Sequence, residues 1–460
     1  MTSGDIYLSI SLVGATIGAG WWLTRKQSKH SKRPVTGTSL SYRECLLQEA
    51  WTRVDQVHPQ KRGVERGERI YNMRLAAESF AQAGDRFNAA KCRSFLAEDE
   101  GDFMTAAAHI EMMLRLLPDS EPASARGALL VSKANNLRRC GWYRSATETS
   151  IQAVQSDAIR QSGVVALHLS AQLLATMGRF EDAEAYATLA LESSKNGVDS
   201  NESQTTLAFL RHVEGRLMEA LNIYEVAAKE SRMPNDFSSC AQMLMAMGRW
   251  QEAEERQNEA LRYNGANPPL IEEAMCATYR VGLAFIYRGQ ERYEEALKEL
   301  DMAEPVLVND VRLSLTCRIQ RLTIMAESKA EPTPFIREQW DAIVADLDKE
   351  IQNIPRHWDA LRFWYDEWHA LAAIRCLLGD VDVAMGLLEP FARAKILHPV
   401  EMPRYYFLRG LCREKQQDFS GAMAEYRHVL SSDCEPVERH FGMARARLME
   451  LSGECVSAVQ

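Results

Sequence analysis

The sequence of 460 residues predicts an all-α solenoid, and three observations support that fold class. A short motif of glycine, a large apolar residue and alanine returns along most of the chain. Alanine, leucine, glutamate, arginine and methionine, which are good helix formers, are abundant. No stretch keeps the period-two alternation of a β-strand for more than a few residues. Because stacked repeats bury their apolar faces only against their neighbours, we expect one long array in place of several globular domains.

The clearest copy of the motif runs from Gly178 through Ala183 to Ala190. The same spacing begins at three other glycines: Gly141, Gly215 and Gly248. A glycine permits a sharp turn between two helices, and alanines seven residues apart lie on one helical face, where a neighbouring helix can approach closely. Each copy is therefore predicted to be a helix–turn–helix unit.

Alanines that follow such a turn set the register of the repeats: Ala106, Ala146, Ala183, Ala220, Ala253, Ala296, Ala384 and Ala422. In seven of the eight units the residue twelve places before the turn alanine is small. We expect the unit at Ala296 to depart from this register. There Gly289 stands seven instead of five places before the alanine, which predicts a turn two residues longer. One step of 88 residues between successive alanines predicts an irregular helix pair near 310–353.

The first 23 residues are predicted to be a short tail and a transmembrane anchor. Residues 6–23 carry no charge, and as a helix with ~1.5 Å rise per residue they would extend roughly 27 Å, close to the thickness of a hydrocarbon core. A cleaved signal peptide is the alternative, but the basic cluster follows the apolar run instead of preceding it, which favours an uncleaved anchor. Gly14 and Gly18 form a GxxxG step, so a homo-oligomer is also a candidate.

Residues 24–38 are predicted to form a basic, polar tether between the membrane and the body. Its cations, Arg25, Lys26, Lys29, Lys32 and Arg33, are expected to stay on the cytoplasmic side. The predicted protein is therefore single-pass, with the N-terminus outside and the solenoid facing the cytoplasm.

The remaining chain is acidic and rich in single cysteines. The net charge is −9 although the first 34 residues carry +4, so the body carries −13, which argues against nucleic acid as a partner. The ten cysteines are scattered, with no CxxC pair and no His/Cys cluster at metal-ligand spacing. We interpret them as small core residues in a reducing compartment, and we expect no metal.

We expect capping helices over 39–83, repeats over 84–433, and a C-terminal capping helix with a tail over 434–460. Most prolines, including Pro305, are expected at junctions between helices, where a missing N–H is tolerated. Pro390 is the exception, since it falls inside a predicted helix and predicts a kink or an early end there.

The units resemble tetratricopeptide repeats, the family of 34-residue helix–turn–helix repeats. Two units are nearly complete: one runs from Gly101 through Ala106 to Pro118, and the other places Trp368 and Ala372 ahead of its turn. The resemblance covers roughly 350 residues and implies a right-handed superhelix. It also implies a concave groove, lined by the first helix of each pair, that binds peptides or helices of partner proteins.

The register of the resemblance implies a set of groove residues that would contact such a partner: Asn135, Arg138, His168, Gln172, Phe209, His212, Gln242 and Tyr279. Their mixed, nearly neutral character suits a segment held by hydrogen bonds and a few aromatic anchors. No catalytic motif is present, whether GxxxxGK[ST], HExxH, GxSxG or GxGxxG, so we expect neither an enzyme nor a cofactor.

The densest aromatic run of the chain spans 358–368. Trp364, Trp368 and Leu371 share a helical face, as packing between helices requires. Core packing is our first interpretation of the run, and Trp358 and Tyr365, which fall on another face, are the candidates for an exposed binding patch.

The sequence thus predicts a membrane-anchored scaffold that recruits partner proteins in the groove of its solenoid. Two alternatives remain open. One is a regulatory sensor with a small ligand in the groove, which a largely closed apolar pocket would favour. The other is a structural, self-oligomerising protein, which a groove filled by the chain itself or by a second copy would favour.

Overall fold

The computed structural model describes residues 41–57, 66–156, 163–194, 198–266, 273–308, 310–354 and 357–453. Within these ranges every regular element is helical, with 22 α-helices and one 3-10 helix. The predicted anchor and the predicted tether lie outside the described residues and stay predictions. Among the helices that are described, none combines the length and the apolarity that a membrane span needs.

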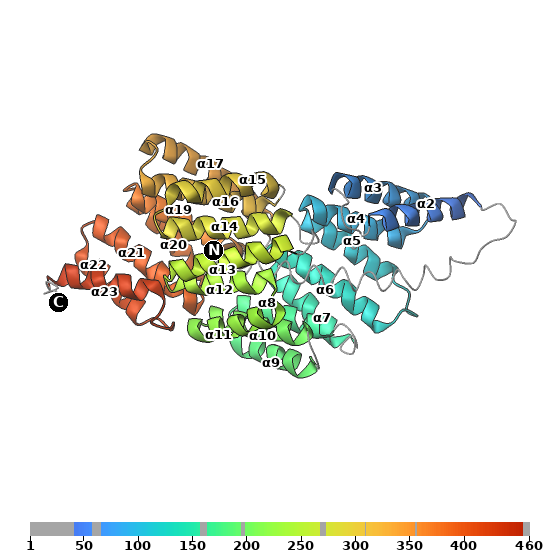
Figure 1. Ribbon diagram of the computed structural model, residues 1–460, viewed down its shortest axis with the longest axis horizontal. Coiled ribbons are helices and arrows are strands. Elements are labelled where there is room, and N and C mark those ends of the chain that lie inside the picture. The colour runs from blue at the N-terminus through green and yellow to red at the C-terminus, as the bar shows by residue number, and fades with distance from the viewer. Residues whose placement is uncertain are drawn as a thin grey trace.

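The helices follow one another as antiparallel pairs (Figure 1). In the region predicted to cap the solenoid lie α2 (Tyr42–Gln56) and α3 (Arg66–Gln82). The regular pairs are α4 (Arg86–Glu100) and α5 (Phe103–Leu116), α6 (Ala123–Arg139) and α7 (Tyr143–Gln155), α8 (Gly163–Thr176) and α9 (Phe180–Ser193), α10 (Val198–Val213) and α11 (Leu217–Ser231), α12 (Pro234–Ala246) and α13 (Trp250–Ala266), and α14 (Glu273–Gly289) and α15 (Tyr293–Leu307). The predicted irregular pair is α16 (Val311–Ser328) and α17 (Thr333–Gln352). The last elements are α18 (His357–Phe363), α19 (Tyr365–Leu377), α20 (Val381–Ala394), η2 (Pro399–Glu401), α21 (Met402–Lys415), α22 (Phe419–Leu430) and α23 (Arg439–Ser452).

The turns within the pairs share one backbone design. The residue five places before the turn alanine has a positive φ, for example 73° at Gly178 and 81° at Gly215. The next amide bonds back across the turn, as Arg179 N–H does to Leu174 O at 2.9 Å. This arrangement satisfies carbonyls at the end of the first helix and reverses the chain, which explains the recurring glycine.

The expected departure at Ala296 is wrong. Glu291, with φ of 61°, takes the left-handed position five places before Ala296, so the turn has the usual length. It is helix α14 that is longer, because it continues to Gly289. The residue twelve places before Ala296 is Ala284, which is buried like its counterparts in the other units.

The turn alanines confirm the predicted register. All eight are fully buried, at 0% exposure, because each lies where the two helices of a pair cross. No larger side chain fits such a position without moving a helix.

Pro305 and Pro390 lie inside helices, which was expected for Pro390 but not for Pro305. Pro305 is in the last turn of α15 instead of at a junction, and Pro390 does not end α20, which continues to Ala394. The buried neighbours Leu388 and Phe391 explain why α20 persists, since their packing holds the last turn although one backbone hydrogen bond is missing.

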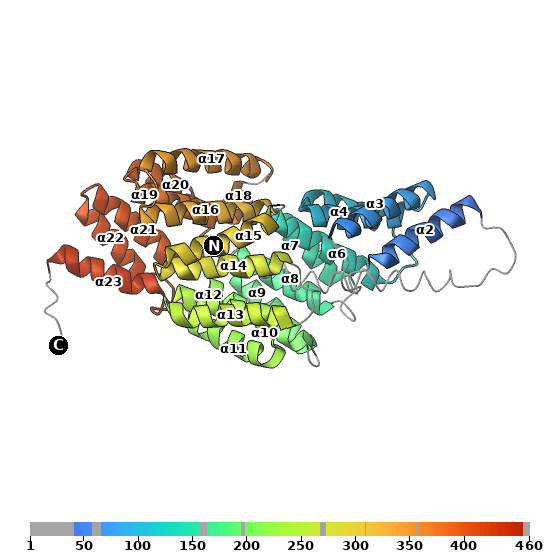
Figure 2. The same cartoon turned by 45° about the horizontal axis from the view of Figure 1, so that its top comes forward.

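The solenoid folds back on itself. We call residues 357–453 the C-terminal arm; its orange and red helices lie beside the green helices α8–α13 in both views (Figures 1 and 2). One continuous apolar core joins α4–α8 to α16–α19, with Leu169, Leu322 and Phe363 among its buried members. Segments some 200 residues apart in the sequence are therefore packed together.

No disulfide joins any two of the described cysteines. Their burial agrees with a core role for five of them: Cys92, Cys240, Cys317, Cys376 and Cys412. Cys45, in contrast, is exposed on α2, so the core interpretation does not extend to every cysteine.

Candidate interaction site

The eight residues expected to line an open groove are all buried, with exposures between 0% and 6%. The expectation that they form a free surface is therefore wrong for Asn135, Arg138, His168, Gln172, Phe209, His212, Gln242 and Tyr279. Whether any of them contacts a ligand stays a prediction.

Two polar members of this set, His168 and Gln172, bond to a neighbouring helix. His168 contacts Thr206 Oγ1 through Nδ1 at 3.0 Å, and Gln172 Nε2 donates to the same hydroxyl at 3.2 Å, so both side chains join α8 to α10. Asn135 Oδ1 accepts from Arg138 within α6. Because the first helices of successive pairs pack against one another, these positions serve the contact between repeats.

The aromatic members also belong to the core. Phe209 packs with Leu174, Ala183 and Val213 in a cluster between repeats. Tyr279 donates through its hydroxyl to Asn235 Oδ1 at 2.5 Å, from α14 to α12. Replacing Phe209 would therefore destabilise the fold before it tested any binding.

A different surface of these repeats makes an interface in the structure. Four successive turns, centred on Gly141, Gly178, Gly215 and Gly248, form what we call the turn row. Each turn receives one segment of the C-terminal arm, and the four segments follow in the same order as the turns. The arm segments therefore run parallel to the turn row, with one segment at each turn.

At the Gly141 turn the arm supplies α18. Asp359 Oδ2 accepts from the backbone N–H of Arg144 at 3.3 Å, in the first turn of α7. A Cβ added at Gly141 would lie 2.6 Å from the Phe363 ring, whose centroid is 6.0 Å from that of Tyr143. Only glycine allows α18 to approach this closely.

At the Gly178 turn the arm supplies His398, which precedes η2. Its Nε2 lies 2.9 Å from Thr176 O at the end of α8, and because a carbonyl only accepts, Nε2 carries the proton. The imidazole also meets the ring of Phe180 edge-on, with centroids 5.9 Å apart.

At the Gly215 turn the arm supplies the loop between α22 and α23. Glu435 N–H donates to Gly215 O at 2.9 Å, and the Glu435 carboxylate accepts from Met218 N–H at 2.7 Å. A Cβ at Gly215 would lie 2.9 Å from Cys434 Cα. Arg216, the residue before α11, makes no capping bond through its side chain, so Glu435 supplies the missing cap from 217 residues away.

At the Gly248 turn the arm supplies the start of α23. The Arg439 guanidinium lies over the Trp250 ring, 5.0 Å from its centroid. A Cβ at Gly248 would be 3.3 Å from Arg439 Cβ. The Arg439 cation therefore covers the aromatic face of Trp250, the first residue of α13.

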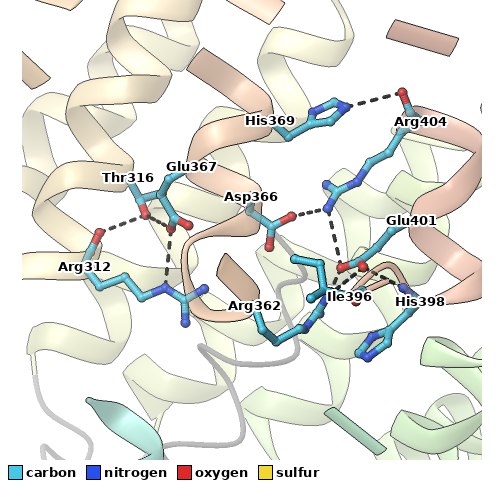
Figure 3. A network of polar contacts seen from close by, with 10 residues as sticks. All are labelled: Arg312, Thr316, Arg362, Asp366, Glu367, His369, Ile396, His398, Glu401 and Arg404. Carbon is cyan, nitrogen blue, oxygen red and sulfur yellow. Dashed lines mark hydrogen bonds and ion pairs between the residues drawn. The ribbon is translucent and has the colours of Figure 1, made fainter. Parts of the chain in front are cut away.

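A buried polar network holds the arm segments in place (Figure 3). Arg362 forms two hydrogen bonds to Glu401, at 2.7 and 3.0 Å, and both side chains are at most 2% exposed. Glu401 also accepts from the backbone N–H of His398 at 2.9 Å. Arg404 pairs with Asp366 beside them. The network thereby links α18 and α19 to η2 and α21, and orients His398 towards the turn row.

Burial also sets the protonation of three histidines near the turn row. Burial, reinforced by the Arg362 guanidinium, lowers the pKa of His398 to about 3. Burial lowers the pKa of His212 and of His168 to about 4 each. All three are therefore neutral at neutral pH.

Acid should weaken the fold through these histidines. In the unfolded chain their pKa is about 6.5, so below that pH the unfolded state binds protons that the folded state does not. The free energy of unfolding should fall as the pH drops from about 6.5 to about 4, by up to about 1.4 kcal/mol per pH unit for each histidine. Denaturant titrations across this range measure the slope.

His398→Gln keeps a donor for Thr176 O and should remove about a third of the histidine contribution to this slope. An unchanged slope would contradict the assignment of His398.

The aromatic run packs in the core, and the alternative of a binding patch at Trp358 and Tyr365 is wrong. Tyr365 is 1% exposed and packs edge-on against Phe391 at 5.1 Å, and Trp358 is half-buried, so no open patch forms there. The reason is the break between α18 and α19 at Trp364, which changes the helical phase. The buried polar network was not predicted from the sequence; the charged residues between the aromatic residues of 357–369 are the sequence signal from which it could have been predicted.

Among the described residues, no group of three or more His, Cys, Asp or Glu side chains is arranged to hold a metal ion. No protein-family model and no curated protein matches the sequence.

Several solved structures match the chain. A tetratricopeptide repeat protein from Parabacteroides merdae ATCC 43184 matches with 14% identity over 80% of this chain and 100% of its own, at a TM-score of 0.25. A Rap protein complexed with competence and sporulation factor matches with 12% identity over 82% and 99%, at 0.47. The Cut9–Hcn1 hetero-tetramer of the APC/C matches with 12% identity over 90% and 84%, at 0.44. By the geometry of its own helix pairs and turns, this chain is a tetratricopeptide-like helical-repeat protein.

Proposed function

We propose that this protein is a scaffold that binds other proteins through its solenoid. One observation supports this most directly: the turn row already binds a protein surface, the C-terminal arm, through carboxylate, aromatic and backbone contacts. Backbone N–H groups at helix starts and aromatic side chains are features of protein recognition sites, and a repeat array presents them at regular intervals.

We further propose that the scaffold acts at a membrane. This part rests on the sequence of residues 6–23 and on the basic tether 24–38, which together favour an anchor with the N-terminus outside and the solenoid in the cytoplasm. Recruitment of partners to the membrane would follow from that topology.

A second candidate is the structural, self-associating role. The C-terminal arm docks on the chain's own repeats. This contact favours the structural role, because the surface covered by the arm is not open to a partner protein. The sensor role gains no such support. A surface hollow of about 440 Å³ on α2 has Gln48, Glu49 and Arg53 among its lining residues and is open, so it is not the closed apolar pocket that would favour the sensor.

Membrane fractionation with partner capture tests the proposal on the full chain. The parent should sediment with membranes, and Ile10→Arg with Leu12→Arg should release it, because each arginine in the middle of a span costs about 2.5–3.5 kcal/mol. Cross-linking before solubilisation should recover a defined partner that re-forms a complex with the purified chain. A chain that stays soluble without the arginines would refute the anchor, and a chain that associates only with itself would favour the structural role.

A further inference from the structure

Two cysteines of the C-terminal arm lie side by side in its core. Cys376 belongs to α19 and Cys412 to α21, the first helices of two consecutive pairs. Their side chains are hydrogen-bonded to each other. Both belong to one apolar cluster, with exposures of 3% and 0%. The fold therefore brings two sulfur atoms from separate helices within direct contact, which is the first requirement of a disulfide.

The two thiols differ in acidity. The Cys412 thiol donates to the sulfur of Cys376, and this hydrogen bond, supported by the Lys415 ammonium, lowers the pKa of Cys376 although burial opposes it. The same hydrogen bond and burial raise the pKa of Cys412. Cys317 shows the effect of burial without such a donor, since its pKa is raised to about 12. Because the thiolate is the nucleophile in thiol chemistry, Cys376 is the attacking residue of the pair.

The pair lies close to the surface although both thiols are buried. Helix α19 ends at Leu377 and α21 ends at Lys415, so each cysteine is in the last turn of its helix. Leu377 is 45% exposed, and Lys415 is exposed as well. The ends of helices open more readily than their centres, so a small oxidant can reach the thiols without unfolding of the repeat.

We propose that Cys376 and Cys412 form a redox-sensitive pair, which hydrogen peroxide oxidises to a disulfide that joins α19 to α21. The Cys376 thiolate attacks one peroxide oxygen and the O–O bond breaks; with one proton taken up, the products are a sulfenic acid at Cys376 and one water. The Cys412 sulfur then attacks the sulfenic sulfur. The S–S bond forms, the S–O bond breaks, and the hydroxide leaves with the Cys412 proton as a second water. Two thiols are oxidised while one peroxide is reduced.

The disulfide would restrain the C-terminal arm. Helix α19 carries Asp366 and α21 carries Arg404, the ion pair drawn in Figure 3, so a covalent link between these helices holds the same contact together. A cross-link also removes conformational freedom from the unfolded segment, which favours the folded state. This inference does not depend on the proposed scaffold function, because it concerns the chain's own helices and needs no partner.

Hydrogen peroxide added to the reduced full chain tests the pair. After alkylation of the remaining thiols, peptide mass spectrometry should find a cross-link between Cys376 and Cys412 that dithiothreitol removes. Amides of α19 and α21 should exchange hydrogen at least about tenfold more slowly in the oxidised chain than in the reduced chain, because a cross-link makes opening of this segment rarer.

Three variants control the test. Cys376→Ala and Cys412→Ala each remove one partner, so neither should gain protection with peroxide. Cys412→Ala should retain a sulfenic acid at Cys376, which dimedone labels, whereas Cys376→Ala should leave Cys412 unlabelled. The matched control is Cys317→Ala, since Cys317 is equally buried and is the only cysteine among the described residues of its apolar cluster. It should form the cross-link as the parent does.

The results decide each step separately. Absence of the cross-link in the folded, peroxide-treated parent would overturn the pair. Equal dimedone labelling of Cys376→Ala and Cys412→Ala would overturn the assignment of Cys376 as the attacking residue. A cross-link that leaves hydrogen exchange in α19 and α21 unchanged would refute the restraint on the arm.

Discussion

Ala183→Trp should unfold the pair α8–α9, lowering the free energy of unfolding by about 3 kcal/mol or more, the upper end of what overpacking costs. Ala183 is 0% exposed and lies in a cluster with Leu174, Phe209 and Val213, so an indole has no space without separating the helices. Because coupling in a solenoid runs mainly between neighbours, the loss should reach α6 and α10 more than α21. Denaturant unfolding and hydrogen exchange by segment measure both effects.

The control lies two residues away on the same helix. Ala185 is exposed, so Ala185→Trp adds the same side chain without entering the core and should change stability by less than about 0.5 kcal/mol. Equal stability of the two variants would mean that the close contact at the turn alanine does not exist in solution.

Arg362→Met should destabilise the protein by about 3–5 kcal/mol. The change leaves the Glu401 carboxylate, 1% exposed, without the partner that makes two hydrogen bonds to it. Burial of a charge that has lost its main counter-ion is costly, and the segment that carries His398 should lose its fixed position. We expect a lower unfolding midpoint and faster hydrogen exchange in η2 and α21.

An exposed pair of the same type provides the comparison. Arg393 and Glu389 pair on α20 with side chains 78% and 66% exposed, so Arg393→Met should cost at most about 1 kcal/mol. Adding Glu401→Gln to Arg362→Met should recover part of the loss, because no buried charge then remains unmatched. If Arg362→Met and Arg393→Met are equally mild, the network in Figure 3 is not buried in solution.

The sequence by itself determined the local architecture. Glycine and alanine at fixed spacing are sufficient to place a turn and a close helix contact, because a positive φ and a small side chain are requirements of single positions. For this reason the burial of all eight turn alanines could be predicted. The error at Ala296 has the same local origin, since Glu291, like Gln417, adopts the conformation that glycine takes at the other turns.

Only the tertiary structure decided which surfaces are free. The contacts of Asp359, His398 and Glu435 with the turn row join residues more than 200 positions apart, and no periodicity in the sequence encodes them. The eight groove residues were expected to be open for a related reason. The register of the repeats determines on which face of a helix these residues lie, but it does not determine which other helices pack against that face. Small rotations between successive pairs accumulate along a solenoid, and their sum decides whether its end meets its own earlier turns or solvent.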